Sequence, residues 1–238
     1  MQTNKNLGHC LTTKKTSEVS PERSKGFAEV AYWNKIKRKE GKLSNQHYKY
    51  FYTTHFGLNA AYYHNKTILD IGCGPRGSLE WASMASRRFG LDPLAKEYLK
   101  LGADQHQMEY IDSPSENIPL KDAECDAVFS FNSLDHVDDV EQTLKEIKRI
   151  TRPGGIFLLL VEVNHPPTAC EPHQLTPRML IESLKTEFIC ESVQAYSPTD
   201  PGMYQSIRTG NKIPNPENTN ETGYLSARYI RSPFAQHS

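Results

Sequence analysis

The sequence carries no net charge, no paired cysteines and no long apolar run. Its Lys and Arg residues number 28, as do its Asp and Glu residues, so we expect no broad basic face and disfavour nucleic acid as a partner. The five cysteines lie far apart and form no C-x-x-C pair, which argues against a disulfide framework. No stretch is apolar enough to span a membrane, and the start lacks the apolar core of a signal peptide. These absences predict a cytoplasmic protein with no membrane partner.

The 238 residues are enough for one α/β domain with additions at its ends. Residues 1–25 are rich in Thr, Ser, Asn and Lys, and we expect a disordered tail. Residues 26–64 predict an N-terminal helical cap, with one helix ended by Gly41 and a second, aromatic helix over 45–56. The aromatic helix either packs its rings onto the domain or forms a lid over ligands, and both roles are compatible. Residues 65–232 form the domain itself.

An apolar strand runs into a glycine-rich turn over residues 68–77. The strand carries Asp70 near its end and breaks into Gly72 and Gly74, as a buried parallel strand does before a tight turn and a helix. Glycines let a ligand approach closely, and the free N–H groups after them attract polar or anionic groups. A dinucleotide site is the usual interpretation of G-x-G-x-x-G, but the Asp70 carboxylate would repel a pyrophosphate and attract an ammonium group. The other alternative is a glycine turn with no ligand.

These residues resemble motif I of the class I S-adenosylmethionine-dependent methyltransferases (methyltransferase type 11-like domain), whose pattern is D-x-G-x-G. The resemblance implies S-adenosyl-L-methionine as cofactor, bound by Asp70, Gly72, Cys73 and Gly74. It also implies a Rossmann-like, doubly wound α/β sheet of seven strands, mostly parallel with the last strand antiparallel. Strands alternating with helices along the chain predict the same parallel, doubly wound sheet.

The segment after the glycine turn predicts a helix over 78–88 and a short second strand that ends at Asp92 and Pro93. Asp92 lies about twenty residues beyond the glycines, where an acidic side chain accepts hydrogen bonds from ribose hydroxyls. The resemblance gives Asp92 and Pro93 this cofactor role, although an Asp before Pro is also a common turn residue or helix cap. A helix over 94–101 should follow.

The loop after a third strand, 108–111, resembles the family segment that lies against the adenine. Ser115 and Glu116 fall on its adenine-facing positions. Pro114 stands where an Asp is common, so a contact with the adenine amino group comes from Asp112 or from backbone groups.

The fourth strand, 125–131, leads into a motif that borders the methionine part of the cofactor in similar methyltransferases. The resemblance places Asn132 and Leu134 beside the cofactor and His136 beside the substrate. No N/D-P-P-Y/F motif follows this strand, which disfavours amino methylation of a nucleic-acid base.

Asp138 or Asp139 should cap a helix over 140–150, and a fifth strand is expected over 156–163. A metal site built from Asp135, Asp138 and Asp139 is the alternative, but capping and solvent exposure explain these carboxylates more simply. We therefore expect no metal.

The loop after the fifth strand, 162–175, packs titratable groups among prolines. His165 and His173 are candidates for a catalytic general base, because imidazole titrates near working pH. The alternative is a polar surface loop in which one His caps a helix. A zinc site from His165, Cys170 and His173 is possible in composition, but its spacing fits no standard pattern. Glu162, with Tyr52 of the aromatic helix, is a candidate for substrate binding.

The remaining chain predicts a helix from Pro177 to about Thr186, a strand over 188–196 and a final strand over 223–230. In the family these last two strands form an antiparallel hairpin. The segment 197–222 between them either covers the substrate or is partly disordered.

The sequence therefore predicts a methyltransferase that acts on a small molecule, with a hydroxyl as the favoured acceptor. One alternative is an RNA or protein methyltransferase, for which the basic residues around 35–42 are the support. Another is a catalytically inactive cofactor-binding partner subunit. The oligomeric state is open.

Overall fold

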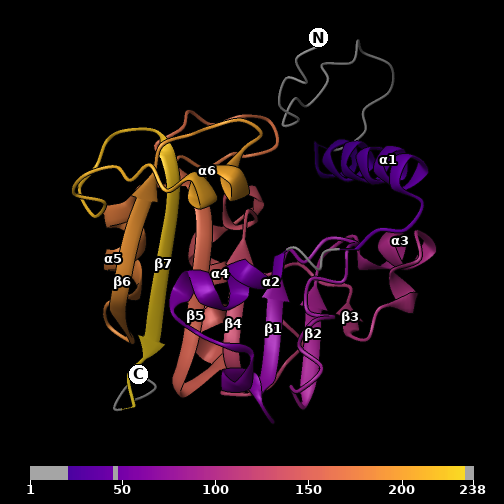
Figure 1. Ribbon diagram of the computed structural model, residues 1–238, viewed down its shortest axis with the longest axis horizontal. Helices are drawn as coiled ribbons and strands as arrows, with labels where there is room; N and C mark the ends of the chain where they lie inside the picture. The colour runs from indigo at the N-terminus through magenta and orange to yellow at the C-terminus, as the bar shows by residue number, and fades with distance from the viewer. Residues whose placement is uncertain (1–20, 45–47, 234–238) are drawn as a thin grey trace.

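A single seven-stranded sheet forms the centre of the computed structural model, which describes residues 21–44 and 48–233 (Figure 1). The strands follow the order β3-β2-β1-β4-β5-β7-β6. β7 is antiparallel to both of its neighbours, and the other pairs are parallel. This confirms the predicted doubly wound α/β sheet with an antiparallel last strand. The strands are β1 Thr67–Ile71, β2 Arg87–Leu91, β3 Glu109–Ile111, β4 Cys125–Phe131, β5 Thr151–Val163, β6 Phe188–Tyr196 and β7 Gly223–Arg231.

The first predicted helix is present and ends before Gly41, but it begins at Pro21 and not at Gly26. The rest of the predicted tail, residues 1–20, lies outside the described residues. Each described helix is too short or too polar to cross a lipid bilayer. The α-helices are α1 Pro21–Glu40, α2 Lys49–Tyr52, α3 Ala95–Lys100, α4 Val140–Ile150, α5 Pro177–Leu184 and α6 Met203–Thr209, and the 3-10 helices are η2 Thr54–Phe56, η3 Ala60–Tyr63, η4 Ala103–Gln105 and η5 Leu134–His136.

The helix predicted over residues 78–88 is wrong. Residues 78–86 follow successive turns, in which the N–H groups of Glu80, Ala82 and Ala85 each donate to the carbonyl three residues earlier. Leu79 and Ala82 are fully buried, so turns with a three-residue period satisfy the apolar spacing that suggested a helix. The glycine turn after β1 therefore leads into further turns, and no helix N-terminus follows it within these residues.

The second predicted helix, 45–56, is replaced by shorter pieces where it is described. Residues 45–47 lie outside the described residues, and α2, η2 and η3 follow. Gly57 adopts a left-handed conformation with a φ of +68°, which ends η2. Phe51 and Tyr63 are 1% and 0% exposed, so this segment belongs to the core. In Figure 1 it lies in front of the sheet, and its aromatic residues share an apolar cluster with Leu79 and Ala82 of the turns after β1.

Two apolar clusters fill the two faces of the sheet. One packs Leu144 and Ile147 of α4 against Leu69 of β1, and the other packs Phe51 of α2 near Ile68 of β1. Successive residues of a strand point to opposite faces, so β1 contributes to both clusters. Because each face is covered, the strands read as continuous apolar runs in the sequence.

The later elements agree with the sequence prediction, except that β5 begins at Thr151 and not at Ile156. Asp139 caps α4 by accepting the Gln142 N–H at 2.9 Å, and Thr176 caps α5. The segment 197–222 is described throughout and contains α6. Tyr204 of α6 stacks on Tyr48, with ring centroids 4.6 Å apart, so this segment packs onto the aromatic residues beside α2.

Candidate functional site

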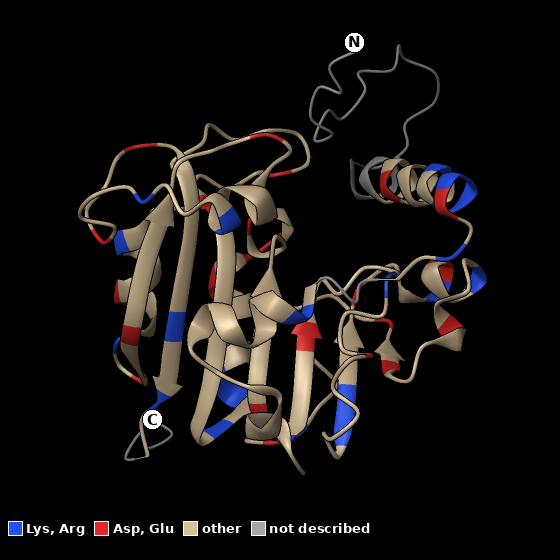
Figure 2. Ribbon diagram, in the orientation of Figure 1, with Lys and Arg blue, Asp and Glu red and all other residues tan. Residues whose placement is uncertain are grey.

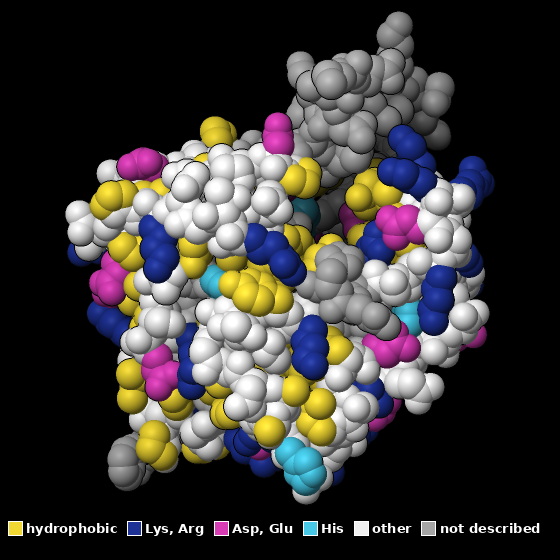
Figure 3. Space-filling view, in the orientation of Figure 1, with side chains coloured by type: hydrophobic (Ala, Val, Ile, Leu, Met, Phe, Trp, Pro, Cys, Tyr) yellow, Lys and Arg dark blue, Asp and Glu magenta, His cyan; other side chains and the backbone are white. Residues whose placement is uncertain are grey.

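The carboxyl ends of β1, β2, β4 and β5 meet at one edge of the sheet, and the chain order reverses between β1 and β4. Open α/β sheets bind ligands in the crevice at such a switch point. Figure 2 shows the acidic end of β1 in red at this edge. Figure 3 shows a hollow in the molecular surface between α1 and the segment around α6. The predicted site residues can be located relative to this edge.

Asp70 is the penultimate residue of β1 and is only 2% exposed. Its Oδ2 accepts a hydrogen bond of 2.9 Å from the phenol of Tyr52, which the aromatic segment brings to the crevice. Burial raises the pKa of Asp70 to about 7, and the hydroxyls of Ser78 and Tyr52 oppose this rise. A buried carboxylate with few donors gains most from a cationic partner, because the opposite charge offsets its desolvation. The structure thus brings Asp70 and Tyr52 together, which the sequence had placed in separate roles.

The hydroxyl of Ser78 is a further polar group beside Asp70. Ser78 is 4% exposed, and its Oγ makes no hydrogen bond of standard geometry with the described residues, although it lies close enough to Asp70 to lower the pKa of that carboxyl. A buried hydroxyl without a partner costs free energy that a polar ligand would recover. The chemistry of Ser78 and Asp70 together fits a ligand that carries both an acceptor and a cationic donor, as an α-amino acid does. Sequence reasoning missed Ser78, because it assigned this residue to a helix.

Gly72 lies where the ends of β1 and β4 approach most closely. Its φ is +67°, and a Cβ on this residue would lie 2.3 Å from the Cβ of Ser133. The Ser133 hydroxyl donates to the carbonyl of Ile71 at 2.8 Å and pairs with the Ser130 hydroxyl at 2.8 Å. Only glycine therefore fits this turn, and Ser133 fixes the first strand to the fourth.

Gly72→Ala is expected to lower the free energy of unfolding by about 1 to 3 kcal/mol more than Gly154→Ala. Both glycines have a left-handed φ, +67° and +75°, so both variants lose similar backbone energy. A Cβ on Gly154 meets nothing within 4 Å, so only the Gly72 variant adds a clash. Chemical denaturation measures the difference. Equal losses would contradict the clash, and Ser133→Gly should restore part of the stability of Gly72→Ala.

Asp92 follows β2 and is 7% exposed. Its Oδ2 accepts the N–H of Gly74 at 3.2 Å, and its Oδ1 accepts the N–H of Leu94 at 2.9 Å. Burial raises the pKa of Asp92 to about 7, although these two backbone donors oppose the rise. The carboxylate therefore caps the turn before α3 and also touches the glycine turn. Each oxygen keeps a second lone pair for a ligand hydroxyl.

Helix α1 lies against the glycine turn. Trp33 lies 3.7 Å from the position that a Cβ on Gly74 would take, and the Arg76 guanidinium stacks near its ring, 5.3 Å from the centroid. Arg76 also makes a bidentate ion pair with Glu40, with N–O distances of 2.8 and 2.9 Å. A tryptophan and an ion pair thus join α1 to the cofactor side of the crevice. The sequence offered no signal for either contact beyond the helical spacing of Trp33.

Ser115 and Glu116, the predicted adenine-facing residues, direct their side chains to α4. The Ser115 hydroxyl pairs with that of Thr143 at 2.9 Å. Glu116 accepts the N–H groups of Asp138 and Asp139 at 2.8 and 2.9 Å, which braces the start of α4. Because both side chains are committed to α4, a contact between this loop and an adenine would come from Asp112 or from backbone groups.

The other predicted cofactor residues occupy varied environments. Cys73 is 8% exposed, and burial raises its pKa well above the ordinary value, so its thiol stays protonated. Pro93 is exposed behind Asp92. Asn132 is exposed with a φ of +56°, and its N–H donates to the Leu160 carbonyl. Leu134 is fully buried in the cluster around α4, so its side chain serves the core.

The structure distinguishes the two candidate bases. Nδ1 of His165 lies 2.9 Å from the Pro166 carbonyl, which can only accept, so Nδ1 carries the proton and Nε2 of the neutral ring presents a lone pair. That Nε2 is buried and has no hydrogen-bond partner among the described residues. Nε2 of His173 lies 2.8 Å from the Val137 carbonyl, to which it donates. His165 therefore retains a basic atom, and His173 ties its loop to the segment before α4.

Glu162, the predicted substrate residue on β5, lies near the same loop. Burial raises its pKa, the protonated form of His165 would lower it, and the charges of Glu171 and Asp135 raise it. These carboxyls and imidazoles therefore share the carboxyl ends of β4 and β5. This group forms the second side of the crevice, across the switch point from Asp92.

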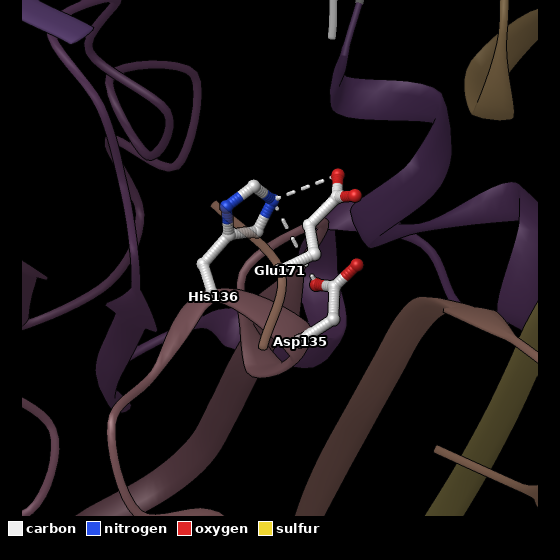
Figure 4. A group of neighbouring side chains, drawn as sticks. All are labelled: Asp135, His136 and Glu171. Atoms are coloured by element: carbon white, nitrogen blue, oxygen red, sulfur yellow. Dashed lines mark ion pairs between the residues drawn. The ribbon is translucent and has the colours of Figure 1, made fainter. Parts of the chain in front are cut away.

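Asp135, His136 and Glu171 converge at this second side (Figure 4). Nε2 of His136 lies 3.9 Å from Asp135 Oδ1 and 3.7 Å from Glu171 Oε1, and the three atoms all lie within 4.8 Å of one another. The acidic trio considered from the sequence is not assembled, because Asp138 is exposed and Asp139 caps α4. Glu171 enters the group through the fold of its loop, which the sequence did not predict.

Comparison with known proteins gives both family and fold matches. Residues 69–159 match the family described as a methyltransferase domain. A malonyl-[acyl-carrier protein] O-methyltransferase of Pectobacterium atrosepticum is 33% identical over 91 residues, which cover 38% of this chain and 36% of that protein. The chain thus spans about a third of the length of the curated relatives it matches.

Two solved structures share the fold at lower identity. The methyltransferase in complex with the Haloferax volcanii Trm112 methyltransferase activator has a TM-score of 0.59 and 17% identity, over 86% of this chain and 98% of that chain. An S-adenosylmethionine-dependent methyltransferase from Mesorhizobium loti has a TM-score of 0.54 and 19% identity, over 71% of this chain and 92% of that chain. Both support the assignment of the sheet topology.

Proposed function

We propose that this chain is a class I S-adenosylmethionine-dependent methyltransferase that transfers a methyl group from S-adenosylmethionine to an oxygen of a small-molecule acceptor. The match of residues 69–159 to a methyltransferase domain supports this proposal. The observation that carries the proposal is the buried Asp70–Tyr52 pair at the switch point of the sheet. A carboxylate there suits the ammonium group of this cofactor and would repel the pyrophosphate of a dinucleotide.

The described residues fit the cofactor at both of its polar ends. Asp70 offers an acceptor to the α-ammonium group, and the unpartnered Ser78 hydroxyl offers a donor to the carboxylate. Asp92, beside the glycine turn, offers its carboxylate to the ribose hydroxyls. When bound, the cofactor supplies a methyl group made electrophilic by its sulfonium. Trp33 and α1 would cover the turn and exclude water, and the chain's contribution is placement of the two reactants.

An oxygen acceptor is supported from two directions. His165 holds a proton on Nδ1 and a lone pair on Nε2, which is the state a general base needs to accept a hydroxyl proton. The matched relative from Pectobacterium atrosepticum is named as an O-methyltransferase. Glu162, His136 and Tyr52 would contact the acceptor. The balanced charge, mixed along the ribbon in Figure 2, favours a small molecule over a nucleic acid.

Two alternatives each have one observation in their favour. An RNA or protein acceptor is favoured by the basic last turn of α1, with Lys37, Arg38 and Lys39. The other alternative is a catalytically inactive, cofactor-binding partner subunit, and the fold likeness to a methyltransferase solved with an activator protein bears only on its having a partner. The activity measurement below separates these alternatives from the main proposal.

Titration calorimetry should show one S-adenosylhomocysteine bound per chain, and Asp92→Ala should weaken that binding about thirtyfold. Loss of the charged acceptor removes about 2 kcal/mol of hydrogen bonding to the ribose. Asp104→Ala, in an exposed position of η4, is the matched control and should bind as the wild type does. Because Asp92 also caps backbone groups, each variant's thermal unfolding is measured alongside. A wild-type protein that ignores the ligand would sink the proposed function, and unchanged affinity of Asp92→Ala would remove this residue from the ribose.

The acceptor class is tested with cofactor carrying a labelled methyl group. The protein is incubated with a small-metabolite extract, with total RNA and with a protein fraction, each separately. Label in an O-methyl group of a small product, either a base-stable ether or an ester, supports the proposal. Label in RNA or protein supports the corresponding alternative. Cofactor binding without label in any fraction supports the inactive partner subunit.

A further inference from the structure

We propose that Asp135, His136 and Glu171 bind a divalent transition-metal ion at the carboxyl end of β4. Among residues 21–44 and 48–233, these are the His, Cys and acidic side chains whose ligand atoms converge on one point. This group differs from the zinc site that the sequence suggested, which would have used His165, Cys170 and His173. The site reverses our expectation of no metal, which rested on Asp138 and Asp139 having other roles.

The spacing of the three side chains suits an ion better than a direct ion pair. The separations of 3.9 and 3.7 Å from His136 Nε2 exceed a hydrogen bond, so the imidazole bonds to neither carboxylate through these atoms. Ligands about 2.1 Å from a metal lie about 3.0 to 3.4 Å from one another. An inward shift of about half an ångström at Asp135 and Glu171 would therefore complete both contacts. Figure 4 shows the imidazole nitrogen facing both carboxylates across one small space.

Asp135 supplies a second, independent sign of a ligand. Its side chain is 1% exposed, and Oδ1, the atom that faces His136, has no hydrogen-bond partner among the described residues. A buried carboxylate oxygen without a donor is costly, and such atoms are rare in native proteins. A cation between Asp135 and His136 would remove that cost.

The surroundings of the group carry an excess of carboxylates. Glu162 lies close enough for the charges of Asp135 and Glu171 to raise its pKa, in addition to the effect of burial. Three carboxyls thus share this region with His136 and His165, whose imidazoles are uncharged when deprotonated. The buried Nε2 of His165, also without a partner among the described residues, adds a lone pair to the same region. The local potential favours a cation.

The ligand set also limits which ion fits. One imidazole nitrogen with two carboxylate oxygens suits Zn²⁺ or Mn²⁺ better than Mg²⁺, which prefers oxygen ligands and waters. Three protein ligands leave at least one coordination position for water or for a ligand oxygen. The loop that supplies Glu171 is braced for this role, because the Thr168 hydroxyl donates to Glu171 Oε2 and leaves Oε1 facing His136.

The test uses full-length, tag-free protein stripped with a chelator and dialysed. Zn²⁺ and Mn²⁺ are each titrated by calorimetry, and bound Mn²⁺ is counted from the loss of its free electron-paramagnetic-resonance signal. One ion per chain is expected for the wild type. Glu171→Gln removes a ligand from a partly exposed loop position and should weaken binding at least tenfold, without unfolding the protein. Asp135→Asn should do the same if it folds.

Asp138→Asn is the matched control, because it removes one negative charge from the same loop in an exposed position outside the group. Its affinity should equal that of the wild type. No binding to the wild type, or equal weakening by Asp138→Asn and Glu171→Gln, would overturn the site in favour of diffuse attraction. The readout is the metal alone, so it stands whether or not methyl transfer is found.

Discussion

Replacing His165 by alanine is expected to lower kcat for a hydroxyl acceptor by about a hundredfold to ten-thousandfold, the range that a positioned general base contributes. The Pro166 carbonyl holds the proton on Nδ1, which leaves Nε2 as the basic atom. Affinity for S-adenosylhomocysteine should stay within about twofold, because the residues proposed to bind the cofactor, Asp70 and Asp92, lie at the ends of other strands. Steady-state kinetics with the acceptor found by the labelling screen, and the calorimetric titration, measure the two quantities.

His173→Ala is the control for disturbance of the loop. It loses the hydrogen bond to the Val137 carbonyl, so we expect about 1 kcal/mol less stability and only a small change in kcat. Acceptors with a more acidic hydroxyl should depend less on His165, since they need less help to lose a proton. A full rate in His165→Ala would remove the base role. Equal losses in the two variants would mean that loop order sets the rate.

Asp70→Asn is expected to weaken S-adenosylhomocysteine binding about a hundredfold, or about 2.7 kcal/mol. The amide keeps the size of the side chain and can still accept from Tyr52, but it cannot carry the charge that pairs with the ammonium group. Asp104→Asn makes the same change at an exposed position and should leave the affinity unaltered. An affinity for Asp70→Asn equal to that of the wild type would contradict the role of Asp70 and with it the observation that carries the proposed function.

The affinity of the wild type should also depend on pH in a defined direction. The pKa of Asp70 is about 7 without ligand, so binding should strengthen from pH 6 to pH 8 and then level off as the carboxylate becomes charged. The groups that face it are the Tyr52 and Ser78 hydroxyls and the Asp92 carboxyl, whose pKa is also about 7. Asp70→Asn should reduce the slope. If the affinity of Asp70→Asn depends on pH as steeply as that of the wild type, the titrating group is Asp92.

The stability of the ligand-free protein should fall as pH rises, whereas the affinity for the ligand should increase. A carboxyl with a raised pKa in the folded state binds a proton between about pH 4 and pH 7 that the unfolded chain has released. The free energy of unfolding should therefore fall as pH rises through this window, and level off above about pH 7. Tyr52→Phe removes a donor to the charged form, so it should shift the upper end of the window to higher pH.

The strands were predictable because their burial on both faces leaves apolar runs bounded by turn residues. The strand over 125–131 was predicted to the residue, and so was helix 140–150, since Asp139 caps it. The stretch 78–86 was misassigned, because Leu79 and Ala82 have a spacing that both a helix and successive turns satisfy. Only packing decides between these two, and here the turns share an apolar cluster with Phe51 and Tyr63 of the aromatic segment before β1.

The residues of the candidate site also fall into a group that the sequence could place and a group that it could not. Asp70 lies near the end of β1 and Asp92 directly follows β2, so the sequence position predicted their place at the sheet edge. Ser115 and Leu134 also lie at that edge, but their side chains turn into α4, which a motif cannot indicate. Glu171 joins His136 only through the path of a long loop, and no local pattern encodes that meeting.

Ser133 connects the two sides of the crevice, at the ends of β1 and β4. Its hydroxyl binds the Ile71 carbonyl at the end of β1, and its neighbours along the chain lead directly to Asp135 and His136. The proposed donor side, at Asp70, and the proposed acceptor side, at His136, are thereby held at a fixed separation across two adjacent strands. The entropy of aligning the two sides is lost once, when the sheet folds, and is not lost again at each turnover.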